Sequence, residues 1–348
     1  MTTGLILGKF LPPHRGHEYL VNFAAGFADA ITVHVCATPA EPIPGALRYE
    51  WMRETFAGRP NLTVVYNPLP QTPQDDPLNF WRLWRDSLLS RQPNNQPPDF
   101  VFASEPYGFE LARTLGAQYI PVDPPRSRFP VSGTAVRADP LREWEYLLPA
   151  TRPYFARRVA VVGAESSGKS TLTAALAAHF GTTFAPEYAR TYLEALPPDE
   201  LARLYAPGGF DAEAMRHFVR GQAASVEAMA RQCNRVVFSD TKAVVTALWC
   251  RHFLGDVPAF VSEQARAQHF DLYLLTAATQ EWAREEQRVQ PDFSDRLRFE
   301  EECGAMLEEH GCPFVRLSGT WAEREEQAVA AVKVLLGENR FNPALHPV

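Results

Sequence analysis

The sequence contains few cysteines and no long apolar run. Only five of its 348 residues are cysteines, and no two of them form a C-x-x-C pair. Their odd number and wide spacing argue against a disulfide framework and a zinc knuckle, so we expect a reducing, cytoplasmic environment. No apolar stretch approaches the roughly 20 residues that cross a bilayer, so we expect no membrane insertion.

Positive charge is also scarce. The chain has 34 Lys and Arg against 41 Asp and Glu, which gives a formal net charge of -7. General binding to nucleic acid usually needs a basic face that contacts many phosphates, so we expect no nucleic-acid partner. The hydrophobic fraction of 46% and the charged fraction of 22% are those of an ordinary globular protein. The length predicts two or three domains.

Two segments share one design, in which a short apolar strand leads into a glycine-bearing loop and then an amphipathic helix. The strands are residues 5–8 and 159–163, and the loops that follow are 9–17 and 164–169. Further apolar runs that predict strands lie at 31–36, 62–66 and 100–103, and at 182–184, 235–239, 272–275 and 313–317. Their alternation with helical stretches predicts an α/β fold with parallel sheets and ligands at the strand ends.

The chain is expected to begin a second sheet near residue 158. The segment 147–158 carries two prolines and three arginines and is the expected junction. We therefore predict one domain over residues 1–150, a second over 151–338, and a tail over 339–348 that lacks periodicity.

The segment 8–17 combines a strand-end glycine, a proline-stiffened turn and two imidazoles three residues apart, His14 and His17. If His17 begins a helix, both rings and several main-chain N–H groups face one point, where the helix dipole favours an anion. Imidazole can donate to a phosphate oxygen without full positive charge. The segment therefore predicts a phosphate site, and the alternative is a turn with structural histidines.

This segment matches the signature G-x-F-x-P-x-H-x-G-H, and a second signature, S-x-T-x-x-R, appears at 132–137. The chain thereby resembles the nucleotidylyltransferase superfamily, whose members join a nucleotide to a phosphate-bearing acceptor. The resemblance implies that the acceptor attacks the α-phosphorus of ATP in line, with alignment and charge stabilisation together with Mg²⁺. It implies an ATP site made of Gly8, Lys9, Phe10, His14, His17, Ser132, Thr134 and Arg137. Lys9 has an alternative interpretation as a solvated loop lysine.

A second motif, G-x-x-x-x-G-K-S, occupies residues 163–170 directly after a predicted strand. In such a loop the main-chain N–H groups wrap phosphates at the start of a helix. Lys169 would bridge the β- and γ-phosphates, and Ser170 would bind Mg²⁺. The remaining residues expected to bind ATP here are Gly163, Ser166, Ser167, Gly168 and Thr171. The motif predicts phosphoryl transfer or nucleotide hydrolysis without specifying the acceptor.

Several charged residues further along are candidates for the same site. Asp240 ends a predicted strand and can hold Mg²⁺ or accept a proton from a substrate hydroxyl, or it is a strand-end turn residue. Glu187, Tyr188 and Arg190 offer a carboxylate, an aromatic face and a cation to a sugar or a cationic ring; they can equally be exposed residues at a helix start. Four arginines flank the segment 290–292, which we expect to precede the last helix: Arg284, Arg288, Arg296 and Arg298. We expect one of them, Arg288 in particular, to contact the transferring phosphate and most of the others to be solvated.

The pairing of an adenylyltransferase signature with a phosphate loop resembles the bifunctional NadR family over residues 3–335, with further landmarks at 104–107, 122–124 and 187–190. The family joins a nicotinamide-nucleotide adenylyltransferase to a ribosylnicotinamide kinase. The resemblance implies phosphorylation of nicotinamide riboside to nicotinamide mononucleotide, and adenylation of that product by ATP to NAD. It also implies that Glu187 and Arg190 bind the riboside, and that Trp81 or Trp84 stacks on the pyridinium ring. Core packing is the alternative for both tryptophans.

The chain departs from the family pattern at three places. It begins almost directly at the first strand, without the helix-turn-helix domain of some members, so we expect no DNA-binding regulator. Lys242 stands where a carboxylate is frequent, which could alter metal or riboside handling. In the family's W-x-D-D-G-x-R segment only Trp282 and Arg288 persist.

Other functions remain open on the sequence alone. One alternative is adenylyl transfer to another acceptor, such as nicotinate mononucleotide or a pantetheine phosphate, fused to an unrelated nucleoside kinase. Another is an ATP-sensing module that transfers no phosphate. The sequence does not set the oligomeric state, and a homo-oligomer is compatible with it.

Overall fold

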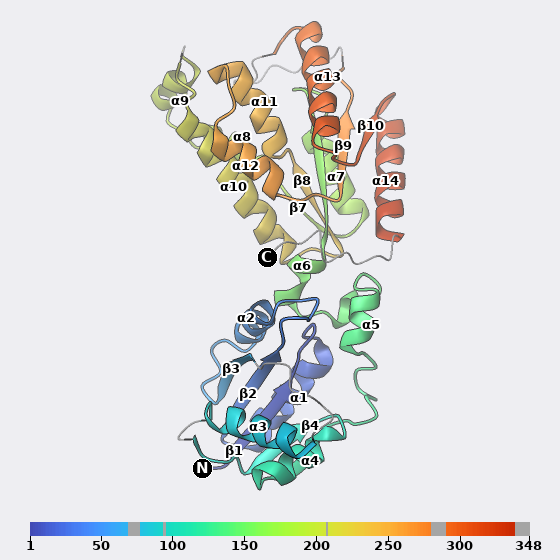
Figure 1. Cartoon of the computed structure of the whole chain (residues 1–348). Helices are drawn as coiled ribbons and strands as arrows, with labels where there is room; N and C mark the ends of the chain where they lie inside the picture. Colours follow the sequence, from blue (N-terminus) through green and yellow to red (C-terminus); the bar gives the residue numbers. More distant parts are fainter. Residues whose placement is uncertain (69–76, 93–94, 207, 280–289, 338–348) are drawn as a thin grey trace. The chain divides into compact units, whose positions relative to one another are not determined.

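The computed structural model describes residues 1–68, 77–92, 95–206, 208–279 and 290–337, without the side chains of 77–81. The chain divides into two compact units, the first being Met1–Tyr154 and the second beginning at Phe155 (Figure 1). This division falls inside the expected junction and four residues after the predicted boundary at residue 150.

The first unit contains a five-stranded parallel sheet in the order β3-β2-β1-β4-β5. Its strands are β1 (Thr3–Gly8), β2 (Ala30–Ala37), β3 (Leu62–Pro68), β4 (Phe100–Ala103) and β5 (Gln118–Pro121). Its helices are α1 (Arg15–Phe27), α2 (Gly45–Thr55), α3 (Pro77–Leu89), α4 (Tyr107–Leu115), α5 (Gly133–Ala138), η2 (Trp144–Tyr146) and η3 (Pro149–Thr151), and α6 (Arg152–Phe155) ends at the division.

The second unit contains another five-stranded parallel sheet, in the order β10-β9-β6-β8-β7. Its strands are β6 (Arg157–Gly163), β7 (Thr183–Ala185), β8 (Val236–Asp240), β9 (Leu272–Thr276) and β10 (Phe314–Leu317). Its helices are α7 (Lys169–His179), α8 (Tyr188–Glu194), α9 (Pro198–Tyr205), α10 (Ala212–Ala230), α11 (Ala243–Leu254), α12 (Ala259–Ala267), α13 (Phe293–Glu309) and α14 (Trp321–Gly337). The segment 290–292 therefore precedes α13, and the expectation that it precedes the last helix was wrong.

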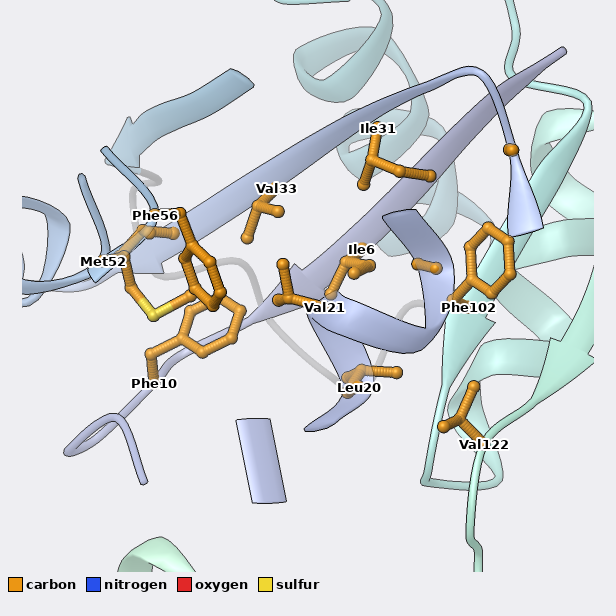
Figure 2. Close-up of a cluster of buried hydrophobic side chains, with 13 residues drawn as sticks. Ile6, Phe10, Leu20, Val21, Ile31, Val33, Met52, Phe56, Phe102 and Val122 are labelled. Atoms are coloured by element: carbon orange, nitrogen blue, oxygen red, sulfur yellow. The ribbon is translucent and has the colours of Figure 1, made fainter. Parts of the chain in front are cut away.

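The predicted α/β class with two parallel sheets is confirmed, and the reason lies in how the strands are buried. Successive residues of β1 face opposite sides of the sheet: Ile6 packs with α1 and α2, and Leu5 packs with α3 and α4. Figure 2 shows the first of these clusters, with Ile6, Val21 and Val33 side by side. Because helices cover both faces, such strands carry continuous apolar runs, and these runs are detectable in the sequence.

The order of the strands fixes where ligands can enter. In the first sheet the chain passes from β1 to β2 on one side and later places β4 on the other side of β1. In the second sheet β6 likewise lies between β8 and β9. Each reversal opens a crevice at the carboxyl end of the strand between them, so Gly8 and Gly163 stand at the mouths of two crevices.

Across the described ranges, no helix has both the length and the apolar character needed to cross a membrane.

Two candidate active sites

The first candidate site begins where β1 passes into α1. His14 is the N-cap of α1, and its Nδ1 accepts a hydrogen bond from the Gly16 N–H at 3.2 Å. The Nδ1 atom of His17 accepts in turn from the His14 N–H at 3.3 Å, and the two rings stack with centroids 3.8 Å apart. Since each Nδ1 accepts from the main chain, each Nε2 carries the ring proton and is a donor. The two imidazoles thus offer neighbouring N–H groups to one ligand.

Both imidazoles are neutral at pH 7. Burial, with a smaller contribution from the charge of Arg126, lowers the pKa of His14 to about 4. Burial, followed by the proximity of His14 and Arg126, holds the pKa of His17 well below its usual value. The rings are therefore uncharged hydrogen-bond donors, which is a protonation state that suits the predicted phosphate site.

The second signature lies against this loop although it is more than 100 residues away in the chain. Ser132 is the N-cap of α5, and its Oγ accepts from the Ala135 N–H at 3.1 Å. Arg137 donates to the carbonyl oxygen of Leu11 and, at 3.2 Å, to Thr134 Oγ1. A Cβ at Gly133 would lie 2.4 Å from the Leu11 oxygen, so only glycine allows this approach. Gly133 was not predicted, although it is the unspecified second position of the signature.

A cavity of about 760 Å³ joins the two signatures. All the described residues predicted for this site line it: Gly8, Lys9, Phe10, His14, His17, Trp84, Ser132, Thr134 and Arg137. The size suits a nucleotide with its acceptor. Trp84 is half-buried and packs against the core cluster under α3 and α4, as the core-packing alternative predicts, while stacking on a ligand stays a prediction. Trp81 lies in α3, but its side chain is outside the described residues.

Phe10 and Lys9 make contacts within the protein that the signature alone does not predict. The Phe10 ring is 1% exposed and packs edge-on against His17, with 4.9 Å between ring centroids. The Phe10 ring therefore packs against the His17 imidazole and has almost no exposed surface for a ligand. The Lys9 ammonium lies 3.1 Å from Glu41, whose carboxylate also pairs with the fully buried Arg48. Neither Glu41 nor Arg48 was identified from the sequence, because their motif-free surroundings give no signal.

Other cavity residues lie at the carboxyl ends of β4 and β5, in segments noted only as family landmarks. Tyr107 donates to the carbonyl oxygen of Leu7 at 2.5 Å. Arg126 pairs with Glu105 at 3.0 Å, and Asp123 accepts from the N–H groups of the loop that follows it. Their place at a strand end, next to the crevice, is the feature that could have identified them.

The second candidate site is built on the turn between β6 and α7. Gly163 has a φ of 141°, and a Cβ there would lie 2.5 Å from Thr276 Oγ1. Ser167 lies inside the loop, since its Oγ donates to the Ala164 carbonyl at 2.8 Å and is 2.6 Å from Thr276 Oγ1. The Ser167 hydroxyl therefore helps to shape the loop. Lys169 Nζ donates to the Ala164 carbonyl at 2.8 Å.

Two carboxylates stand beside this lysine. The Ser170 hydroxyl donates to Asp240, which is 2% exposed at the end of β8. Burial raises the pKa of Asp240, and the charge of Lys169 opposes that shift. Burial, followed by the charge of Asp240, raises the pKa of Glu187. The two acids therefore resist being charged together until more positive charge is bound.

The donor set at this point suits Mg²⁺. Asp240 Oδ1 is buried and has no hydrogen-bond partner among the described residues. A carboxylate oxygen next to a serine hydroxyl and a phosphate loop is the oxygen-rich environment that Mg²⁺ requires, with phosphates and waters completing the set. Ser170 and Asp240 are therefore the residues that would hold the ion.

The cavity of about 310 Å³ beside the loop has a charged side and an aromatic side. Glu187 and Arg190 lie on the charged side with 3.9 Å between their charged groups. The aromatic side chains are Tyr205, Phe210, Phe218, Trp249 and Phe253. Phe253 stacks on Phe210 and on Trp249, with ring centroids 4.5 and 5.6 Å apart. None of the five was predicted; the spacing of Trp249 and Phe253 on α11 was the available signal.

Three expectations for this site need correction. The Tyr188 ring is not among the residues that line the described cavity, because it packs against the main chain of Gly221, where an added Cβ would meet it at 2.0 Å. Lys242 is 2% exposed and extends away from the cavity, donating to Tyr273 Oη at 2.6 Å and to the Gln268 carbonyl. The Lys242 ammonium therefore contacts Tyr273, Gln268 and Ala265, and none of these three residues lines the cavity. Arg296 is also buried, and donates to loop carbonyls. Arg288 lies outside the described residues.

The chain is similar to known proteins over almost its whole length. A family model described as "AAA domain" matches residues 158–324. The "Trifunctional NAD biosynthesis/regulator protein NadR" of Escherichia coli (strain K12) is 31% identical over 97% of this chain and 84% of its own length. A "Nicotinamide-nucleotide adenylyltransferase" of Methanosarcina barkeri (strain Fusaro / DSM 804) is 24% identical over 43% of this chain and 84% of its own length.

Solved structures share the fold. A NadR protein in complex with NR covers 98% of both chains with a TM-score of 0.78 and 23% identity. A second NadR structure, in complex with NAD and AMP-PNP, covers 98% of both chains with a TM-score of 0.75 and 23% identity. The identity to the Escherichia coli relative and the share of its length that is matched are decisive, and the chain belongs to the NadR family.

Proposed function

We propose that the second unit phosphorylates the 5′-hydroxyl of nicotinamide riboside with ATP, and that the first unit transfers AMP from a second ATP to the resulting nicotinamide mononucleotide. The products are NAD and pyrophosphate, and the chain is a bifunctional enzyme of NAD biosynthesis. The observation that supports the assignment is that two strand–turn–helix motifs with predicted phosphate-binding sequences lie in separate units, and each lines its own cavity.

In the kinase half, we assign the role of each residue from its contacts. Ser170 and Asp240 hydrogen-bond to each other, so we assign them to Mg²⁺, which would shield the phosphates of ATP. Glu187 lines the cavity and has a raised pKa, so we assign it to accept the proton of the riboside hydroxyl. Lys169 binds the transferring phosphate, and the stack of Trp249, Phe253 and Phe210 takes the cationic ring.

In the adenylyltransferase half, no side chain needs to act as a nucleophile, because the acceptor phosphate itself attacks the α-phosphorus. His14 and His17 donate from Nε2 to oxygens of the departing pyrophosphate, and Arg137 adds its charge at the end of the same cavity. The neutral rings match charge that develops only as the bond breaks. We assign Trp84, which lines this cavity, to stack on the pyridinium ring.

Two single substitutions test this assignment in the intact chain. Lys169→Ala should lower riboside phosphorylation by about 10²-fold or more, because the γ-phosphate loses its side-chain cation. His17→Ala should lower NAD formation from nicotinamide mononucleotide by about 10²-fold and leave the kinase intact. Each variant is incubated with ATP and Mg²⁺, and chromatography measures the nicotinamide mononucleotide and NAD that it forms. Failure of the unmodified protein to form NAD from the mononucleotide, or loss of both activities in either folded variant, would contradict the proposal.

The acceptor is tested in the same assay. Nicotinate mononucleotide differs from nicotinamide mononucleotide by a carboxylate in place of an amide. We assign the amide form because solved structures of the NadR fold carry NR and NAD. Faster adenylation of the nicotinate form would transfer the assignment to that acceptor. We place the reaction in the cytoplasm, where ATP is available and free thiols such as those of the five cysteines persist.

A further inference from the structure

Arg296 joins two parts of the second unit that are separated in the chain. It lies on α13 and is 1% exposed. One of its terminal nitrogens donates to the Thr279 carbonyl at 3.0 Å. The other donates to the carbonyls of Gln290 at 3.0 Å and Pro291 at 2.5 Å. A single guanidinium therefore binds the chain at Thr279 and again at Gln290 and Pro291.

The phosphate loop contacts the same two segments, at Thr279 and at Gln290. Thr279 Oγ1 donates to the Ser166 carbonyl at 3.2 Å. Glu165 accepts a hydrogen bond from the Gln290 N–H at 2.9 Å. Both loop residues line the cavity together with Lys169. Arg296 thus holds the segments at Thr279 and Gln290 together, and hydrogen bonds from Thr279 and to Glu165 hold them against the phosphate loop.

The chemistry of these contacts makes them sensitive to substitution. The guanidinium is rigid and planar, so its hydrogen bonds to the Thr279 and Gln290 carbonyls require a fixed separation between these two carbonyls. Its acceptors are main-chain carbonyls, and that of the buried Gln290 would lose its hydrogen bond if the guanidinium were removed. Ser166 has a φ of 58°, a conformation that a serine keeps only where its surroundings hold it. The network therefore holds the loop in the shape it has beside Lys169.

We propose that Arg296 and Glu165 are positioning residues for phosphoryl transfer, holding the chain at Thr279 and Gln290 against the phosphate loop. This inference rests on the kinase function proposed for the second unit. Neither residue is required to touch the riboside. Their loss should lower kcat through misalignment of ATP and leave the KM for riboside unchanged.

The test uses the full chain with four variants and one matched control. Arg296→Gln and Glu165→Ala should lower the kcat of riboside phosphorylation by about 10- to 100-fold, the cost of a small misplacement of reacting groups. Glu165→Gln keeps an acceptor for the Gln290 N–H and should restore most of the rate. The kcat of Arg296→Lys should lie between those of Arg296→Gln and the unmodified protein, because an ammonium cannot bond to the Thr279 and Gln290 carbonyls at the same time. Arg298→Gln, two residues along α13 at an exposed position, should match the unmodified protein.

The adenylyltransferase activity of the same molecules reports whether each variant is folded and should not change. The inference is overturned if Arg296→Gln and Glu165→Ala keep the original kcat, if Glu165→Gln is as impaired as Glu165→Ala, or if the loss falls on the KM for riboside instead. It is also overturned if the adenylyltransferase activity falls in parallel.

Hydrogen exchange separates this inference from the function on which it rests. In the protein without substrates, the Gln290 amide should exchange faster in Glu165→Ala than in Glu165→Gln or the unmodified chain. If the unmodified chain fails to phosphorylate riboside, the proposed function fails, and the exchange rates still decide whether the network holds this segment. Equal exchange in all three proteins would overturn the positioning role.

Discussion

Burial and, to a smaller extent, the charge of Arg126 keep both imidazoles of the first site neutral, and their neutrality makes the stability of the chain depend on pH. The pKa of His14 is about 4 in the folded chain, against 6.5 for the free side chain. The unfolded chain therefore binds more protons between these values, and the stability associated with neutral His14 is present above pH 6.5 and is lost as the pH falls toward 4.

We expect thermal denaturation to show this directly. Between pH 7 and pH 4.5, the melting temperature of His14→Gln should fall less than that of the unmodified protein, because glutamine does not titrate. Adenylyl transfer in the unmodified protein should show no step near pH 6.5, the pKa of an ordinary imidazole. Parallel melting curves for the two proteins, or a step at that pH, would mean that His14 titrates as an exposed histidine.

Lys242 provides a second test at a single position. Its ammonium is buried among Tyr273, Gln268 and Ala265, and burial lowers its pKa to about 8. Lys242→Met should therefore leave the KM for riboside unchanged and destabilise the second unit by about 1–3 kcal/mol, through carbonyls left without a donor. Steady-state kinetics and a denaturant titration measure the two effects. A large rise in that KM would place Lys242 in the riboside site after all.

At the scale of elements, α5 is held against the loop after β1 by a contact that tolerates no side chain at Gly133. A Cβ there would lie 2.4 Å from a main-chain oxygen, so Gly133→Ala must move either α5 or the loop. Adenylyl transfer should fall by about 10²-fold as Ser132 and Arg137 shift, while riboside phosphorylation persists.

Gly26→Ala is the matched control for this substitution. Gly26 lies in α1 of the same unit, and a Cβ there meets nothing within 4 Å. Alanine should stabilise the helix by up to about 1 kcal/mol and leave both activities intact. If the two variants lose adenylyl transfer equally, the close contact with Leu11 is not what holds α5 in place.

The elements also differ in how far they could be predicted. The long buried strands β1, β2 and β6 were evident as apolar runs, because helices cover both faces of a parallel sheet. The four residues of β5 were missed, since all are at least partly exposed and the run is too short to form a pattern. The contribution of α11 to the aromatic side of the second cavity was also missed, because the apolar residues of α11 resemble those of any core helix.

At the scale of the whole molecule, the division into two units predicts that the two reactions can be separated and recombined. Lys169→Ala alone should make NAD from the mononucleotide but not from the riboside, and His17→Ala alone should stop at the mononucleotide. A mixture of the two should make NAD from the riboside, because each cavity is lined by one unit and the intermediate can diffuse between molecules. Failure of the mixture, with both single activities retained, would require transfer of the intermediate within one chain.

The sequence by itself determined the local structure: the two turns with predicted phosphate-binding motifs, the strands that carry them and the α/β class. This was possible because a turn between a buried strand and a helix is encoded by residues that are neighbours in the chain. Only the tertiary structure decided which distant residues complete each site. The tertiary structure brought Ser132–Arg137 to Leu11. It assembled the aromatic side of the second cavity from α9, α10, α11 and Phe210, which precedes α10. It also directed the Lys242 ammonium away from that cavity. These arrangements depend on packing between elements, which no short sequence pattern specifies.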